Sequence, residues 1–244
     1  MHDFKNKTAL VTGASRGIGA AIAEALAQRG CRLILTCSHS MDQLTALAER
    51  LARTYEVMVT PAVCDAGDPD QVAALFDTRV HHLDFLINNA GRSVTGLIQD
   101  LAPEAWDDLV RTNLSSCFYT SRLAIPKFLE GGGGAIVNIS SVWGDVGAAA
   151  EAAYSATKGG VAAFTRALGK ELAPSRIPVN ALACGFIDTD MNAEYSADER
   201  EAIRAEIPAD RFGTPEEVAA AVIRLLDMPD YLTGQVIRLD GGWI

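Results

Sequence analysis

Tyr154 and Lys158 are four residues apart in the stretch YSATK, so both side chains lie on one face of a helix. A phenol donates a proton at neutral pH, and an adjacent ammonium makes it a stronger acid by stabilising the phenolate. Ser141 ends the strand-like run AIVNISS, and Asn113 lies in the helical pattern DDLVRTNLSS. These residue types suit carbonyl reduction, in which negative charge develops on an oxygen that needs a proton donor and a hydrogen-bond donor.

We therefore predict that Asn113, Ser141, Tyr154 and Lys158 are the catalytic residues. Tyr154 would donate the proton and Ser141 would hold the carbonyl oxygen. Asn113 would orient water that feeds protons to Lys158.

A glycine-rich stretch, LVTGASRGIG, follows an apolar strand and opens a helix. Gly13 allows a sharp turn, Gly17 lets the backbone approach a pyrophosphate, and Gly19 permits close packing of helix on strand. The spacing GxxxGxG departs from the GxGxxG fingerprint, and no GK[ST] follows it. The context still predicts a dinucleotide site.

The end of the second strand indicates which dinucleotide binds. NAD-preferring folds place a carboxylate there to bind the ribose hydroxyls, whereas residues 33–40 read LILTCSHS and contain no acid. Arg16, with Ser38 or His39, could instead bind a 2′-phosphate, so we predict NADPH/NADP+ as the cofactor. Asp65, after the third strand, could bind the adenine amino group.

Short apolar runs alternate with helical patterns along the chain. This order predicts one Rossmann-type α/β domain over residues 1–244, with a doubly wound parallel sheet of about seven strands. A long helical stretch is expected from about 103 to 130, and the glycines at 131–134 are expected to form a surface loop. The charged segment from about 190 to 214 is too long for a tight connection and is predicted to be a substrate lid.

Composition narrows the class of protein. The net charge of −10 argues against nucleic acid as a partner, and no run of residues is apolar enough to predict a membrane span or a secretion signal. The five cysteines are far apart without a CxxC pattern, which favours a reducing, cytoplasmic location. The histidines, including His2, fit no metal-binding pattern, and no metal is expected.

Taken in order, TGASRGIG, NNAG, Asn113, Ser141 and YSATK resemble the short-chain dehydrogenase/reductase family over nearly the whole chain. The resemblance implies a seven-stranded Rossmann-type sheet, a homotetramer, and a Lys158 that also binds the nicotinamide ribose. The stretch ACGFIDTDM resembles the family's PGxxxT segment with Cys184 in place of proline, which implies that Ile187 and Thr189 contact the nicotinamide amide. The predicted cofactor-binding residues are Gly13, Ser15, Arg16, Gly17, Ile18, Gly19, Ser38, His39, Asp65, Asn89, Ala90, Gly91, Tyr154, Lys158, Gly185, Ile187 and Thr189.

Within the family the pattern is closest to the 3-oxoacyl-[acyl-carrier-protein] reductases of fatty acid biosynthesis, with acyl carrier protein as a candidate partner. Reductases that use this acidic carrier usually present basic residues after the fourth helix, whereas residues 127–135 here read KFLEGGGGA, and only Lys127 and Arg176 are basic candidates nearby. An NADP(H)- or NAD(H)-linked reductase or dehydrogenase of a small ketone or secondary alcohol is the alternative. A catalytically silent dinucleotide-binding regulator would tend to lose the Tyr154–Lys158 pair. Trp143 and Tyr195 could line the substrate pocket or serve apolar packing.

Overall fold

The computed structural model describes residues 4–192 and 195–244. His2 and residues 193–194 of the expected lid therefore lie outside the described part of the chain. None of the described helices is long and apolar enough to cross a membrane.

Seven parallel strands form one sheet in the order β3-β2-β1-β4-β5-β6-β7, which confirms the predicted fold class. The central strands are buried on both faces, and for this reason runs such as LILTC in β2 are almost continuously apolar. The strands are β1 (Thr8–Val11), β2 (Arg32–Cys37), β3 (Val59–Val63), β4 (Phe85–Asn88), β5 (Ala135–Ser141), β6 (Val179–Cys184) and β7 (Val236–Leu239).

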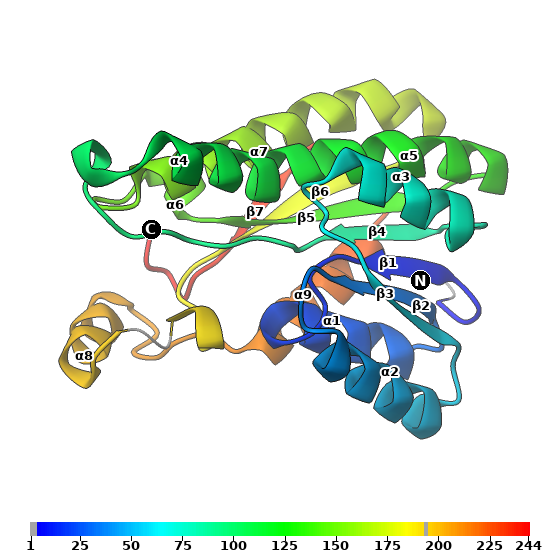
Figure 1. The fold of residues 1–244 in the computed structure, drawn as a ribbon, viewed down its shortest axis with the longest axis horizontal. Helices are drawn as coiled ribbons and strands as arrows, with labels where there is room; N and C mark the ends of the chain where they lie inside the picture. Colours follow the sequence, from blue (N-terminus) through cyan, green and yellow to red (C-terminus); the bar gives the residue numbers. More distant parts are fainter. Residues whose placement is uncertain (1–3, 193–194) are drawn as a thin grey trace.

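Helices cover both faces of the sheet (Figure 1). The α-helices are α1 (Gly17–Gln28), α2 (Met41–Tyr55), α3 (Pro69–Thr78), α4 (Pro103–Val110), α5 (Ser116–Gly131), α6 (Trp143–Val146), α7 (Ala152–Leu172), α8 (Ala197–Glu206) and α9 (Pro215–Leu226). Short 3-10 turns are η1 (Ile98–Asp100), η3 (Ala173–Ser175) and η4 (Asp190–Asn192), and η2 (Arg111–Ser115) is a π turn.

Two hydrophobic cores hold these layers together. Side chains of α1, α2 and α9, such as Leu26 and Val222, pack on one face of the sheet. Those of α3, α5 and α7, such as Phe128 and Leu172, pack on the other. Burial of large apolar side chains on both faces fixes the strands in place, so the loops at their ends have a rigid base.

The predicted helical stretch from about 103 to 130 is present, but the π turn Arg111–Ser115 divides it into α4 and α5. The glycines that follow form the expected loop, because Gly132 and Gly133 have φ of 81° and 144°, values that other residues rarely adopt.

The helices α8 and α9 were not predicted from the sequence. The signal for α9 was present: Thr214 and Glu217 form a capping box, and Pro215 occupies the first helical position. The helix α9 packs against α1 and completes the helical layer beneath the glycine loop.

Candidate active site

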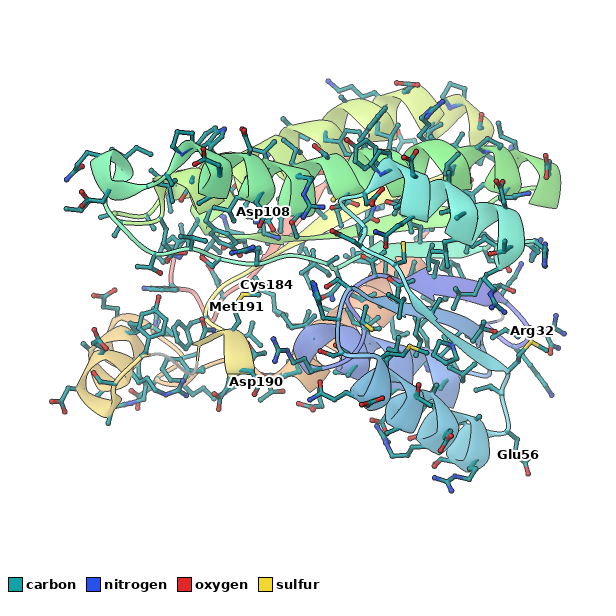
Figure 2. The ribbon with its side chains drawn as sticks, viewed as in Figure 1. Arg32, Glu56, Asp108, Cys184, Asp190 and Met191 are labelled. Atoms are coloured by element: carbon teal, nitrogen blue, oxygen red, sulfur yellow. The ribbon has the colours of Figure 1, made fainter. Side chains whose placement is uncertain are left out.

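The site lies at the carboxyl edge of the sheet. After β3 the chain crosses to the other side of β1, so β1 and β4 are neighbours from which the helices depart to opposite faces. Figure 2 places Cys184, at the carboxyl end of β6, far from Arg32, at the amino end of β2. A cavity of about 1180 Å³ opens at the carboxyl edge.

The cavity brings the predicted residues together. All seventeen predicted cofactor-binding residues, which include Tyr154 and Lys158, line it, and so does Ser141. Asn113 is 1% exposed and is not among the residues that line the cavity.

Gly19 leaves no room for a side chain. A Cβ there would overlap the Gly13 carbonyl oxygen and lie 2.6 Å from Asn89 Nδ2. At Gly13 the backbone φ is 63°, and a Cβ would lie 2.9 Å from Ala90 Cα. The loop after β1 is therefore packed directly against the loop after β4.

Asn89 fastens these two loops together. Its Nδ2 donates to the carbonyl oxygens of Thr12 and Gly13, each at 2.9 Å. The hydroxyl of Thr12 accepts from the backbone N–H groups of Asn89 and Ala90, each at 3.0 Å. The Asn89 side chain therefore shapes the glycine loop.

The start of α1 fits a phosphate group. Arg16 makes no side-chain cap, and the first turn holds no acidic residue, so the N-terminal N–H groups and the helix dipole are available to an anion. The residues present thus suit the pyrophosphate of a dinucleotide.

The predicted 2′-phosphate site lies at the same wall. Arg16 is well exposed, with Nη1 3.9 Å from Asp190 Oδ2 across the groove. Ser38 Oγ and His39 Nδ1 are hydrogen-bonded to each other at 2.9 Å. These groups are close enough to the surface to rearrange around an incoming anion.

Asp65 has a partner that the sequence did not predict. Its Oδ2 accepts from Arg111 Nη1 at 2.6 Å, and its Oδ1 accepts from the Gly67 backbone N–H at 2.9 Å. Arg111 Nη2 also bonds Asp108 at 2.7 Å. Any contact of Asp65 with adenine would share the carboxylate with Arg111, which only the fold brings close.

Ser141 and Tyr154 both line the cavity. The Ser141 hydroxyl group lies close enough to lower the pKa of the Tyr154 phenol, and the Trp143 backbone N–H donates to Ser141 Oγ at 3.2 Å. Ser141 ends β5, whereas Tyr154 lies in the first turn of α7. A carbonyl oxygen could therefore be bonded by both hydroxyl groups.

Lys158 and Asn113 lie one layer deeper. Lys158 Nζ lies 5.6 Å from the centre of the Tyr154 ring and donates to the Ile139 carbonyl oxygen at 3.0 Å. A Cβ on Gly91 would lie 3.5 Å from Lys158 Nζ and 3.3 Å from Asn113 Oδ1, so these groups converge behind the tyrosine.

The Asn113 side chain makes three hydrogen bonds. Oδ1 accepts from the Arg92 N–H at 2.9 Å, and Nδ2 donates to Arg92 O at 2.8 Å and to Thr157 Oγ1 at 3.1 Å. Asn113 lies in the π turn, so this turn joins the loop after β4 to α7.

Burial shifts the pKa values of the central groups. It raises the pKa of the Tyr154 phenol, an effect that the Ser141 hydroxyl group partly offsets, and it lowers the pKa of the Lys158 ammonium. We expected Lys158 to lower the Tyr154 pKa, but the largest effect on this phenol is desolvation, and the net shift is upward. Tyr154 is protonated at neutral pH and remains a proton donor.

The segment after β6 closes the cavity. Burial raises the pKa of the Cys184 thiol to about 12, so this side chain is a neutral wall. Ile187 pairs with Gly213 in an isolated bridge, and Thr189 Cγ2 lies 3.6 Å from where a Gly17 Cβ would be. Figure 2 shows Asp190 and Met191 on this segment, between the sheet and α8.

The comparisons with known proteins agree with this geometry. An uncharacterized oxidoreductase of Bacillus subtilis, YmfI, is 39% identical over 239 residues, covering 98% of this chain and 99% of that protein. The 3-oxoacyl-[acyl-carrier-protein] reductase FabG of Aquifex aeolicus is 38% identical over 243 residues, covering 98% of each.

Among solved structures, a short-chain type dehydrogenase/reductase from Mycobacterium marinum matches with a TM-score of 0.91 and 31% identity, covering 99% of this chain and 96% of that one. L-sorbose reductase from Gluconobacter frateurii, solved with NADPH and L-sorbose, matches with a TM-score of 0.92 and 28% identity, covering 100% and 99%. Residues 7–200 match the family described as short chain dehydrogenase, and the chain therefore belongs to this family of nicotinamide-dependent oxidoreductases.

Proposed function

We propose that the protein is an NADPH-dependent carbonyl reductase that acts on 3-oxoacyl thioesters, with Tyr154 as the proton donor. The observation that carries the proposal is that Ser141, Tyr154 and Lys158 line one cavity together with the glycine loop. The curated relatives named as 3-oxoacyl-[acyl-carrier-protein] reductases support the substrate class.

The dinucleotide would be held by the glycine loop and by Lys158, and when bound it supplies a hydride for the carbonyl carbon. Ser141 would donate a hydrogen bond to the carbonyl oxygen and orient it toward Tyr154. As negative charge develops on that oxygen, Tyr154 would transfer its phenolic proton. The ammonium of Lys158, one helical turn away, would then stabilise the phenolate.

Arg16 supports the choice of NADPH. It lines the cavity with Ser38 and His39, and the end of β2 has no carboxylate to repel a 2′-phosphate. L-sorbose reductase, the similar structure solved with NADPH, agrees with this choice.

The thioester would enter between the segments 142–153 and 190–212, and we propose that the segment from about 190 to 214 acts as a lid. Lys127 is 4.0 Å from Glu130, so one of the two basic residues available for an acidic carrier is already partly neutralised. We therefore expect acyl carrier protein to raise kcat/KM by only about tenfold or less, with little effect of salt.

A cytoplasmic homotetramer is part of the proposal. Exposed apolar side chains on α5 and β7, such as Phe118, Leu129 and Ile237, support association, because such groups favour burial between subunits. Light scattering coupled to size exclusion tests it, and a monomer at micromolar concentration would contradict it.

A reductase of small ketones is the second candidate, favoured by the similarity to L-sorbose reductase. One assay separates the two: NADPH oxidation with acetoacetyl thioesters of pantetheine, coenzyme A and acyl carrier protein, at low and high salt. Turnover of the pantetheine thioester supports the proposal. No turnover with any of the three rejects it in favour of the small ketone.

A further inference from the structure

Four aromatic side chains line the end of the cavity beyond Ser141 and Tyr154. They are Trp143, Phe186, Tyr195 and Trp243. They come from four separate places in the chain: α6, the segment after β6, the start of the lid and the C-terminal tail. Only the fold assembles them, in a chain with 7% aromatic residues.

The four side chains form two walls. The Trp143 and Trp243 rings meet edge to face, with centroids 4.8 Å apart at 61°. Phe186 and Tyr195 form the second pair, with ring centroids 5.6 Å apart and an interplanar angle of 63°. Because Trp143 also donates its backbone N–H to Ser141 Oγ, the tryptophan wall is anchored beside the position of the reacting carbonyl.

Packing behind the walls fixes them. Phe212 lies 4.3 Å from Phe186 by ring centroids, and the Arg200 guanidinium lies over both rings at 5.8 and 4.8 Å. Trp243 Nε1 donates to Glu206 Oε2 at 3.3 Å, which orients the indole. The aromatic faces are thus held before a substrate binds, which lowers the entropic cost of stacking.

The same end of the cavity disfavours negative charge. Glu151 and Glu206 line it, and the nearby Arg92 is paired with Asp108. A free carboxylate on the substrate would face two like charges, whereas Arg92 is already paired with Asp108.

We infer that the natural substrate carries an uncharged aryl group on its reacting ketone, and that Trp143 and Trp243 select it over saturated groups of the same size. The inference rests on the proposed function only for the carbonyl reduction itself. The ketone takes one hydride from NADPH at carbon and one proton from Tyr154 at oxygen, giving the alcohol and NADP+. Aromatic rings pair favourably beyond their burial, which is the basis of the selection.

The test compares two thioesters of N-acetylcysteamine that differ only in their ring: 3-oxo-3-phenylpropanoyl and 3-cyclohexyl-3-oxopropanoyl. We expect kcat/KM to favour the phenyl compound by about tenfold, and Trp243→Leu and Trp143→Leu to reduce this ratio to about two or less. Trp106→Phe is the control, because Trp106 lies on α4 outside the cavity lining. Equal efficiency with the two rings in the wild type would overturn the inference.

A second pair of substrates tests the effect of a negative charge on the substrate. Methyl phenylglyoxylate should be reduced at least tenfold more efficiently than phenylglyoxylate, and Glu206→Gln should narrow the difference. Comparable reduction of the acid by the wild type would overturn the exclusion of carboxylates.

The panel distinguishes this inference from the proposed function. Reduction of methyl phenylglyoxylate but of no thioester would reject the thioester proposal and support the aryl site. Reduction of the acetoacetyl thioester without a preference for the phenyl compound would support the thioester proposal and reject the aryl site. Calorimetric titration with benzamide and cyclohexanecarboxamide, which are not reduced, gives a readout without turnover: benzamide should bind at least fivefold more tightly, and equal affinities would overturn the aryl inference.

Discussion

Arg16 offers a test of cofactor choice whose size follows from the structure. Arg16→Ala removes the one arginine of the glycine loop, and an ionic hydrogen bond to a phosphate contributes about 1.5–3 kcal/mol. The kcat/KM for NADPH should therefore fall by about 10- to 150-fold, while that for NADH, which lacks the 2′-phosphate, should change little.

Asp190 supplies the matched variant. Its Oδ2 is 3.9 Å from Arg16 Nη1, and both side chains are mostly exposed, at 72% and 65%. Coulomb's law at the dielectric constant of water gives about 1 kcal/mol for such a pair, and exposed pairs are worth between 0 and about 1 kcal/mol. Asp190→Asn frees the guanidinium, so it should strengthen NADPH binding by up to about fivefold.

The assay measures kcat/KM for both cofactors with one ketone, together with the dissociation constants from fluorescence titration of the free protein. Arg176→Ala, at the end of η3 and outside the cavity lining, is the control. Equal losses with NADPH and NADH in Arg16→Ala would refute the reasoning, because they would assign Arg16 to the fold of the loop rather than to the phosphate.

Three further predictions follow from packing, capping and burial. Gly19→Ala should abolish measurable cofactor binding in fluorescence titration, since its Cβ would lie 2.6 Å from Asn89 Nδ2; unchanged affinity would show that the loop can relax. Thr214→Ala removes the cap of α9 and should cost about 1 kcal/mol, or about 2–4 °C in Tm by calorimetry, and an unchanged Tm would contradict the cap. The five buried cysteines should not react with a thiol reagent at pH 8 until the protein unfolds, because burial holds the pKa of Cys184 at about 12; rapid labelling of Cys184 in the folded protein would contradict this.

Most of the fold can be predicted from the sequence, because individual elements have clear local signals. The run LILTC in β2 and the helical spacing after Gly17 are local signals, and each is strengthened by the alternation of strands and helices. The helix α9 was not predicted, although its capping box, Thr214 with Glu217, is a local signal that directly follows the charged segment.

The candidate site also has a part that local sequence patterns predict and a part that they do not. Spacing on one helix indicated Tyr154 and Lys158, and position after strands indicated Ser141 and the glycine loop. Asp65 pairs with Arg111, which is 46 positions away in the sequence, and no local pattern predicts this pair. The meeting of Trp143 with the C-terminal Trp243 is likewise a product of tertiary packing.

The effect of burial on the pKa of Tyr154 could not be predicted from the sequence either. Proximity of Lys158 suggested a lowered pKa for Tyr154, but the enclosure of the phenol by the cavity raises it. Only the three-dimensional surroundings decide which effect is larger.

The central claim is that the Tyr154 phenol protonates the carbonyl oxygen. The most direct measurement is NADPH oxidation with the acetoacetyl thioester of pantetheine by the wild type and Tyr154→Phe, with NADPH affinity measured in parallel. The account predicts a loss of at least about 100-fold in kcat with NADPH binding retained, because the phenylalanine ring keeps the packing and removes only the hydroxyl. Near-normal turnover by Tyr154→Phe would contradict it.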